Sequence, residues 1–403
     1  MRLLSAIIAV LLTFSLPAWA QSRLVRIEGK HFIAPDGSPL HLKGISLGNW
    51  LMPEGYMFKF EVAKAPRQIY GAFDRLLGPE RASAFWRTYR DTYIDQDDIR
   101  FIKSVGFNMV RIPLHWRLFM TADGHIDGDG WALLDRVVGW AREAGLYVIL
   151  DLHAAPGGQT GINHDDGPGY PLMFYVPRDR DLTVKFWRAI AEHYAGNPAI
   201  LGYDLLNEPI APYHDTATLN PRLEPFYKRL TSAIRAVDPD RIVFLAGGQW
   251  SSSFDMFGPP FAPNLAYTYH SFWASTKRDS IQRHLNFADR YNVPLFLGET
   301  GELTDQWNEG FRKLHEAHDI GWSFWTYKNL DSPSTVVSIP RPEGWNDIVA
   351  FADGQRRDRP SATVIDRAVA QYLEGIPLAR TTIRWSYLAS LGLKSGPDAP
   401  ASR

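Results

Sequence analysis

Two glutamates at the ends of strand-like segments are the residues in this sequence best placed to do chemistry. Glu208 follows the apolar run 200–207 and precedes Pro209, and Glu299 follows the strand-like run 293–298. Proline cannot donate to a β-ladder, so strand pairing should stop before Pro209 and leave Glu208 at a strand tip. Two carboxyl groups that flank a glycosidic bond can hydrolyse it, one as the acid and the other as nucleophile or as the base that activates water.

The elements that must position these carboxyls alternate along the chain between strand-like and helical patterns. The strand-like segments cover residues 41–48, 108–116, 146–153, 200–207, 241–247, 265–272, 293–298 and 321–327. Amphipathic helical patterns cover residues 66–106, 131–144, 182–196, 222–237, 279–291, 306–318 and 361–373, while segment 251–263 offers no clear helix. Eight such units predict the α/β class and a closed (β/α)8 TIM barrel.

Segments outside these units are predicted to cover the ends of the barrel. Arg23 to Leu40 has the pattern of a short N-terminal β-hairpin, with Asp36-Gly37 as a turn signal, and we expect it to cap the barrel bottom. Residues 21–375, hairpin included, are therefore treated as one catalytic domain. Residues 376–403 form a C-terminal tail, in which 383–391 are expected to dock and the remainder to fray.

The first twenty residues have the features of a secretory signal peptide. Met1-Arg2 is a charged start, Leu3 to Leu16 is apolar, and Ala18-Trp19-Ala20 matches a cleavage site. We expect cleavage after Ala20 and a periplasmic or extracellular protein. No stable membrane anchor is expected, because the apolar run is short for a span and lacks a positive flank on its far side.

Composition narrows the range of functions. The chain has 403 residues, of which 45% are hydrophobic and 22% charged, and a formal net charge of -1, with charges of both signs scattered along it. This argues against nucleic-acid binding or a membrane-surface role, which need a basic patch. The absence of cysteine excludes disulfides, thiolate metal sites and cysteine nucleophiles. Nothing in the sequence indicates an oligomer, and we expect a monomer.

Polar or aromatic side chains recur where the predicted strands end. These are Arg111, His153, Asn207, Glu208, His270, Glu299 and Trp325. Each alone has a structural explanation, such as a buried ion pair or a core histidine, but barrel active sites lie at the C-terminal strand ends and all of these residues meet there. Arg111 beside one carboxylate would keep it ionised, while burial with few cations would keep the other protonated.

Taken together, these motifs resemble the retaining β-glycosidases of glycoside hydrolase family 5, the cellulase and exo-β-1,3-glucanase group. The resemblance covers roughly residues 24–375 and rests on Val-Arg-Ile-Pro at 110–113, Asp-Leu-His at 151–153, Asn-Glu-Pro at 207–209, His270, Gly-Glu-Thr at 298–300 and Trp-Ser-Phe-Trp at 322–325. Gly-Asn-Trp-Leu at 48–51 and Tyr-Ile-Asp-Gln-Asp-Asp-Ile at 93–99 are more similar to the exo-glucanase branch.

The resemblance implies a secreted hydrolase of β-glucan or a related β-glucoside that works by double displacement. It implies Glu208 as acid/base, Glu299 as nucleophile, Asn207 on the sugar 2-hydroxyl, Arg111 and His153 as supports, His270 near the acid/base and Trp325 as the sugar platform. Asn49 and Trp50, which emerge from the end of the first barrel strand, are added as substrate-binding candidates. The substrate would be an oligo- or polysaccharide, or a glycolipid β-glycoside.

One position departs from the family pattern. The family has His-x-Tyr after the sixth strand, with a tyrosine that hydrogen-bonds the nucleophile, whereas this chain has Phe272. Phe272 keeps the ring and loses the donor. Tyr269 should face away from His270, because strand side chains alternate, so Tyr327 is the candidate replacement. Alternatively, Phe272 forms part of an apolar wall for a hydrophobic aglycone.

No metal or other cofactor is expected, since the histidines lack metal-binding spacing. His164-Asp165-Asp166, in a glycine-rich loop, could contact substrate or ions, or could belong to a solvated surface loop. Two alternatives to hydrolysis stay open. One is a carbohydrate-binding barrel that has lost catalysis, and the other is a transglycosylase on the same scaffold.

Overall fold

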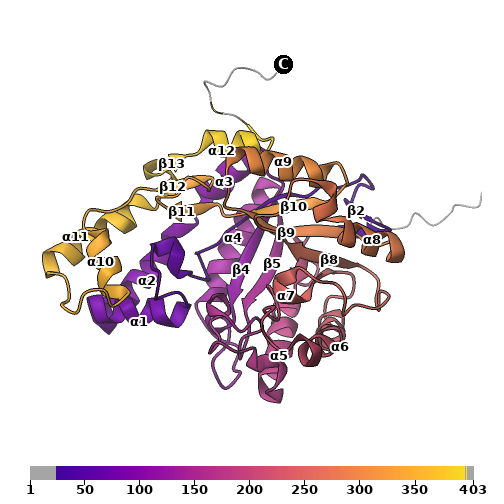
Figure 1. Cartoon of the computed structure of the whole chain (residues 1–403), viewed down its shortest axis with the longest axis horizontal. Coiled ribbons are helices and arrows are strands. Elements are labelled where there is room, and N and C mark those ends of the chain that lie inside the picture. The colour runs from indigo at the N-terminus through magenta and orange to yellow at the C-terminus, as the bar shows by residue number, and fades with distance from the viewer. Residues whose placement is uncertain (1–23, 395, 397–403) are drawn as a thin grey trace, which may run out of the picture.

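A closed ring of eight parallel strands forms the centre of the computed structural model, which describes residues 24–394 and 396 (Figure 1). In ring order the strands are β3 (Lys43–Ser46), β4 (Met109–His115), β5 (Tyr147–Ala154), β6 (Ile200–Asp204), β7 (Ile242–Ala246), β8 (Leu265–His270), β9 (Leu295–Gly301) and β10 (Gly321–Trp325). β10 pairs with β3 and closes the ring. The predicted (β/α)8 barrel is therefore confirmed.

Helices surround the ring and follow the predicted order. They are α1 (Pro66–Leu77), α2 (Pro79–Tyr93), α3 (Gln96–Val105), α4 (Gly130–Ala144), α5 (Pro177–His193), α6 (Thr216–Arg235), α8 (Gln282–Tyr291), α9 (Asp305–Glu316) and α11 (Ala362–Gly375). The segment 66–106, predicted as helical, contains three helices because Gly78 adopts a positive φ of 80° and Pro79 starts the next helix. After β7 the chain forms only the four-residue α7 (Gly248–Ser251), in agreement with the missing helix pattern.

Apolar side chains close the bottom of the barrel. The hairpin of β1 (Arg26–Glu28) and β2 (His31–Ile33) lies there, and Phe32 stacks on Phe244 of β7 with ring centroids 5.9 Å apart. The cluster around Phe32 consists of Val25, Leu42, Met109, Ile149, Leu201, Ile242, Phe244, Ala266 and Phe296. This plug leaves the opposite end of the barrel for polar side chains.

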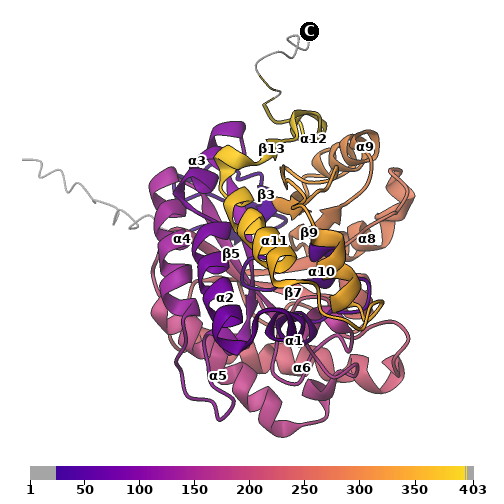
Figure 2. The same ribbon diagram turned by 90° about the vertical axis from the view of Figure 1, so that its left-hand side faces the viewer.

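The chain after β10 covers one side of the barrel. It forms β11 (Lys328–Leu330), β12 (Val337–Ile339) and α10 (Trp345–Ala352), and Figure 2 shows α10 and α11 beside α1 and α2. The docked tail comprises β13 (Thr382–Ile383), which pairs with β12, and α12 (Trp385–Ser390), which contacts α9.

The expected docking of 383–391 is therefore present. Lys394 N–H also donates to the Val105 carbonyl at 3.0 Å, so the contact extends past residue 391 into the part expected to fray. Residues 395 and 397–403, and the predicted signal peptide, lie outside the described residues. Across 24–394 and 396, none of the helices has both the length and the apolar character needed to cross a membrane.

Candidate active site

A cavity of about 560 Å³ opens at the C-terminal end of the barrel strands. It is lined by seven of the side chains predicted for the site: His153, Asn207, Glu208, His270, Phe272, Glu299 and Trp325. The structure thus brings together residues from five barrel strands or the segments that follow them. Arg111 is fully buried and lies outside the cavity lining, which corrects its assignment as a substrate-binding residue.

Glu208 is held where the chain leaves β6. β6 ends at Asp204, ahead of Pro209 as expected, and Glu208 has a left-handed φ of 46°. This conformation costs free energy in a residue with a Cβ, so surrounding contacts must hold it. Asn207 N–H donates to the Leu152 carbonyl at 3.0 Å, and Ile210 N–H donates to the Gln159 carbonyl at 2.9 Å. These bonds tie both sides of Glu208 to the β5 segment.

Two histidines contact the Glu208 carboxyl group. His270 Nδ1 lies 2.9 Å from Oε1, and His164 Nε2 lies 3.2 Å from Oε2. Burial raises the pKa of Glu208, although His164 and Arg111 act in the opposite direction. Burial also lowers the pKa of His270 to about 3 and that of His164 to about 4, so both imidazoles are neutral near pH 7. Glu208 is therefore suited to carry a proton that it can donate.

Glu299 sits above a buried network centred on Arg111. Arg111 Nη1 lies 2.5 Å from Glu299 Oε1, and Nη2 lies 2.9 Å from Asp204 Oδ2 and 3.0 Å from Asp151 Oδ1. Nη2 also donates to Asn207 Oδ1 at 3.0 Å. One guanidinium thereby orients both the Glu299 carboxylate and the Asn207 amide.

The charges around Arg111 are unequal in number. Burial alone would lower the pKa of Arg111, but Asp151, Asp204 and Glu299 raise it above its ordinary value. Burial raises the pKa of Asp151 and of Asp204 to about 7 in each case, although Arg111 opposes the shift. The guanidinium therefore stays charged while the two aspartates can share protons beneath the cavity.

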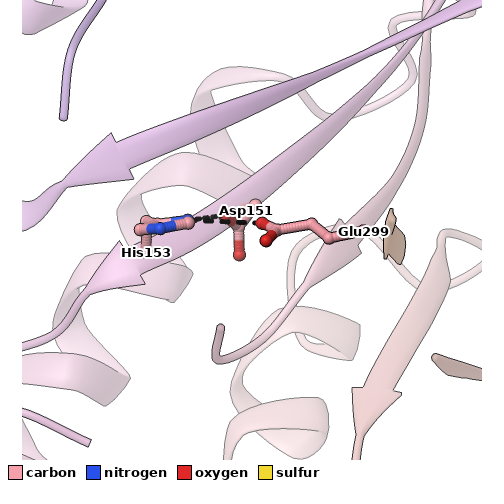
Figure 3. A group of neighbouring side chains, drawn as sticks. All are labelled: Asp151, His153 and Glu299. Atoms are coloured by element: carbon pink, nitrogen blue, oxygen red, sulfur yellow. Dashed lines mark hydrogen bonds and ion pairs between the residues drawn. The ribbon is translucent and has the colours of Figure 1, made fainter. Parts of the chain in front are cut away.

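His153 joins this network to the cavity. Figure 3 shows Asp151 and His153, both from β5, beside Glu299 from β9. His153 Nδ1 is 2.8 Å from Asp151 Oδ2 and 3.8 Å from Glu299 Oε1, and its Nε2 is 3.3 Å from the Asn207 amide nitrogen. Burial lowers the pKa of His153 to about 4, so the ring is neutral near pH 7. It also stacks on Trp325, with ring centroids 5.6 Å apart.

Sequence reasoning missed one whole side of the cavity. We call Glu54, Tyr56, Glu302 and Trp325 the acidic wall. Trp325 Nε1–H donates to the Tyr56 hydroxyl at 2.6 Å, and that hydroxyl donates to Glu302 Oε1 at 2.8 Å. Burial raises the pKa of Glu302 to about 7. Burial also raises the pKa of Glu54 well above its usual range, with Glu299 and Glu302 adding to the shift.

Asn49 and Trp50 require a correction, because neither lines the cavity and both are buried. Asn49 Oδ1 accepts a hydrogen bond from the Glu54 backbone N–H at 2.9 Å, and Trp50 Nε1–H donates to the Arg90 carbonyl at 2.8 Å. After β3 the chain turns toward α2, so these side chains face that helix. Asn49 acts on the site by holding Glu54 in place.

A different surface lies next to β7 and β8. We call Trp250, Phe272 and Trp273 the aromatic wall; all three line the cavity, and Phe272 and Trp273 have ring centroids 5.6 Å apart. Tyr327 cannot replace the family tyrosine, because it is buried and its hydroxyl donates to Asp98 Oδ1 at 2.7 Å. The suggestion that it supports Glu299 is therefore wrong.

Tyr269 faces away from the cavity as expected. It is buried, and its ring stacks on His284 at 4.1 Å, outside the cavity lining. The residues that accept or approach the Glu299 oxygens are Arg111 and the two histidines, with His270 Nδ1 at 3.6 Å from Oε2. Phe272 thus joins an aromatic surface, and an arginine takes the place of a phenol beside Glu299.

The loop that carries His164 is folded onto the site. Asp165 is buried, and its carboxylate accepts the backbone N–H groups of Thr160, Gly161 and Gly167 at 2.7–2.8 Å. These bonds bring His164 to Glu208 and correct the alternative of a solvated surface loop. No spacing pattern in the sequence signals this contact, because it depends on how the loop folds back.

Comparison with known sequences identifies the family. The family model described as Cellulase (glycosyl hydrolase family 5) matches residues 76–331. The chain belongs to glycosyl hydrolase family 5. This confirms the resemblance inferred from the motifs, and it makes the protein a glycoside hydrolase.

Relatives with printed functions are fungal. A beta-xylosidase of Phanerodontia chrysosporium is 29% identical over 76% of this chain and 71% of its own length. A probable glucan 1,3-beta-glucosidase A of Aspergillus fumigatus is 32% identical over 51% of this chain and 50% of its own length. A sporulation-specific glucan 1,3-beta-glucosidase of Saccharomyces cerevisiae is 32% identical over 66% and 58% of the respective lengths. The match thus spans only about half of some of these relatives.

Solved structures share the fold of this family 5 chain. An endogalactoceramidase has a TM-score of 0.63 at 18% identity, covering 91% of this chain and 84% of its own. The rutinosidase from Aspergillus niger has a TM-score of 0.59 at 17% identity, covering 72% and 90%. Likeness at this level of identity shows the barrel architecture alone.

Two groups of side chains have ligand atoms close enough to consider a cation. Asp151, His153 and Glu299 form one, and Glu208, His270 and Glu299 form the other; in each, the ligand atoms lie within 4.8 Å of one another. Arg111 already contacts both Asp151 and Glu299, so a guanidinium supplies the positive charge in the first group. The second group joins the two carboxyls predicted to act on substrate.

Proposed function

We propose that this chain is a retaining β-glycoside hydrolase that acts on β-glucan or a related β-glucoside. The spacing of the two carboxyls carries the proposal: an oxygen of Glu208 and one of Glu299 lie within 4.8 Å of each other at the cavity. Retaining glycosidases have carboxyl groups about 5–5.5 Å apart, whereas inverting enzymes need about 6.5–9.5 Å to fit a water molecule. The fungal relatives named as glucan 1,3-beta-glucosidases support a glucan substrate.

The reaction proceeds in two displacements. Glu299 attacks the anomeric carbon while Glu208 donates its proton to the glycosidic oxygen, the bond to the leaving sugar breaks, and a covalent glycosyl ester forms on Glu299. Glu208, now a carboxylate, removes a proton from water. That water attacks the anomeric carbon, frees Glu299 and leaves a β-configured product.

Residues around the carboxyls support both steps. Arg111 orients Glu299 and Asn207, which places the Asn207 amide nitrogen beside the anomeric region to donate to the sugar 2-hydroxyl. Trp325 offers a flat ring to the apolar face of the sugar. The alternative of a barrel without catalysis loses support, since both carboxyls line one cavity and each has its own orienting partners.

Chemical rescue tests the roles of the two carboxyls. Removing Glu299 blocks the first step, so Glu299→Ala should be nearly inactive and should form an α-glycosyl azide when azide enters the empty space. Glu208→Ala should lose about 10²–10⁴-fold on poor leaving groups, keep activity on good ones, and give a β-glycosyl azide. Glu309→Ala, an exposed carboxyl on α9, is the control. The reverse pattern of azide products would contradict the assignment.

We also propose that residues 1–20 are removed during export, and that residues 21–375 form the catalytic domain. Sequencing the N-terminus of secreted protein should find Gln21. Full-length protein that retains Met1 and stays in the cytoplasm would refute the export proposal.

A further inference from the structure

A run of aromatic rings leaves the cavity edge and crosses two neighbouring loops. Trp250 lines the cavity, and its ring centroid lies 6.0 Å from that of Tyr213. We call Tyr213, His214, Tyr170 and Tyr175 the aromatic track. Successive centroids along it are 4.7 Å apart from Tyr213 to His214, 5.1 Å from His214 to Tyr170 and 5.4 Å from Tyr170 to Tyr175.

The tyrosines of the track are exposed, which is unusual for rings that touch one another. Tyr213 is 61% exposed, Tyr170 40% and Tyr175 37%. Contiguous exposed apolar surface on a folded protein marks a binding surface more often than isolated exposed residues do. These rings also carry hydroxyl groups at their edges, so the surface alternates between flat apolar faces and hydrogen-bonding groups.

The track stands on a rigid base. Ala211 N–H donates to the Thr160 carbonyl at 3.0 Å, and His214 Nε2 lies 3.3 Å from the Gly161 carbonyl oxygen, so the loops after β5 and β6 are bonded together. The Arg222 guanidinium lies over the Tyr175 ring at 4.8 Å. A surface that is ordered before binding loses less conformational entropy when its ligand arrives.

The track lies on the side of the cavity from which Glu208 acts. Pro212 lines the cavity four residues after Glu208, and Tyr213 follows it directly. The acid/base protonates the leaving group, so the surface beyond it receives the part of the substrate that departs. Glu54 and Glu302 belong to the acidic wall, which holds the Trp325 platform instead.

We propose that the aromatic track binds the distal sugar units of a β-glycan chain whose scissile bond lies in the cavity. The inference rests on the proposed glycosidase function and extends it to long, polymeric substrates. Pyranose rings match the track, because they have apolar faces for the tyrosine rings and hydroxyls for the phenol and imidazole groups. An alkyl chain would leave those polar edges without partners.

Chain length is the variable that tests the proposal. The double substitution Tyr170→Ala/Tyr213→Ala should lower kcat/KM about tenfold on laminarihexaose, mainly through KM, if each lost ring contact is worth roughly what an aromatic pair contributes. Activity on laminaribiose and on a small aryl β-glucoside should not change, since these ligands end inside the cavity. Trp140→Ala, a partly buried tryptophan on α4, is the matched control.

Binding provides a second readout that does not require turnover. In a Glu299→Gln background, calorimetry should show that the double substitution weakens laminarihexaose binding and leaves laminaribiose binding unchanged. Equal effects on both lengths, or no effect on either, would overturn the proposal. So would weaker activity on dispersed glucosylceramide with intact hexaose activity, which would assign the track to lipid. An unsubstituted protein that binds hexaose through the track but cleaves no glycoside would refute only the glycosidase function.

Discussion

The acidic wall and the aromatic wall border one cavity but are built from different interactions. In the acidic wall, Trp325, Tyr56 and Glu302 are joined by two hydrogen bonds of 2.6 and 2.8 Å. In the aromatic wall, Trp273 is 72% exposed and its recorded ring contact is with the neighbouring Phe272. Hydrogen bonds have direction, so the first surface can select the position of a sugar hydroxyl. Ring contacts are less directional, and the second can accept varied leaving groups.

Backbone conformation also separates the two regions. Gln249, Trp250 and Ser251 have consecutive left-handed φ values of 53°, 58° and 59°, and Trp273 has a φ of 55°. Left-handed residues with side chains cost free energy, and such strain is typically found at ligand sites. The aromatic wall therefore presents its rings through loop conformation. The acidic wall adds side-chain bonds to Glu302, which itself has a φ of 59°.

The largest effect is expected when the acidic wall loses its central hydroxyl. Tyr56→Phe removes the acceptor of Trp325 Nε1–H and the donor to Glu302, and a hydrogen bond to a charged group is worth about 1.5–3 kcal/mol. We expect kcat/KM to fall about 10- to 100-fold for a series of aryl β-glucosides, whatever their leaving group. Tyr213→Phe, on the exposed track, is the control. A loss that varies with leaving group would mean that Tyr56 contacts the aglycone.

A smaller and selective loss is expected from the aromatic wall. Trp273→Ala should lower kcat/KM about 2- to 10-fold for aryl glycosides and oligosaccharides, from the loss of one ring contact. β-Glucosyl fluoride has no aglycone beyond one atom, so its hydrolysis should be unchanged. Kinetics on the two substrate classes with the same enzyme preparation provide the comparison. A parallel loss on the fluoride would place Trp273 on the glycone.

The smallest effect concerns stability. Burial raises the pKa of Glu302 from 4.5 to about 7 in the folded protein, so between these values the folded state binds a proton that the unfolded state lacks. Stability therefore falls as pH rises through this window. Glu302→Gln should match the unsubstituted protein near pH 4 and have the higher Tm near pH 8. Calorimetric curves of the two proteins that shift in parallel with pH would argue against a titrating Glu302.

Sequence patterns determined the barrel and the residues at its strand ends. The apolar runs that precede Glu208 and Glu299 are local features, as are the amphipathic helices between strands, and local features survive in the fold because the hydrophobic face of each element must be buried. The barrel topology then places every strand's C-terminal end at one face. Strand order and strand-end chemistry together were therefore enough to select Glu208, Glu299 and the family.

Tertiary structure alone decided how those residues are held and what else surrounds them. Glu54, Glu302 and His164 lie in loops without periodicity, and their positions follow from long-range bonds such as that of Asn49 to the Glu54 backbone. The same loops misled the sequence prediction for Asn49 and Trp50, which turn away from the cavity. Loop conformation is set by contacts between segments far apart in the chain, so no local pattern encodes it. For the same reason, the aromatic track became visible only when the loops after β5 and β6 were seen side by side.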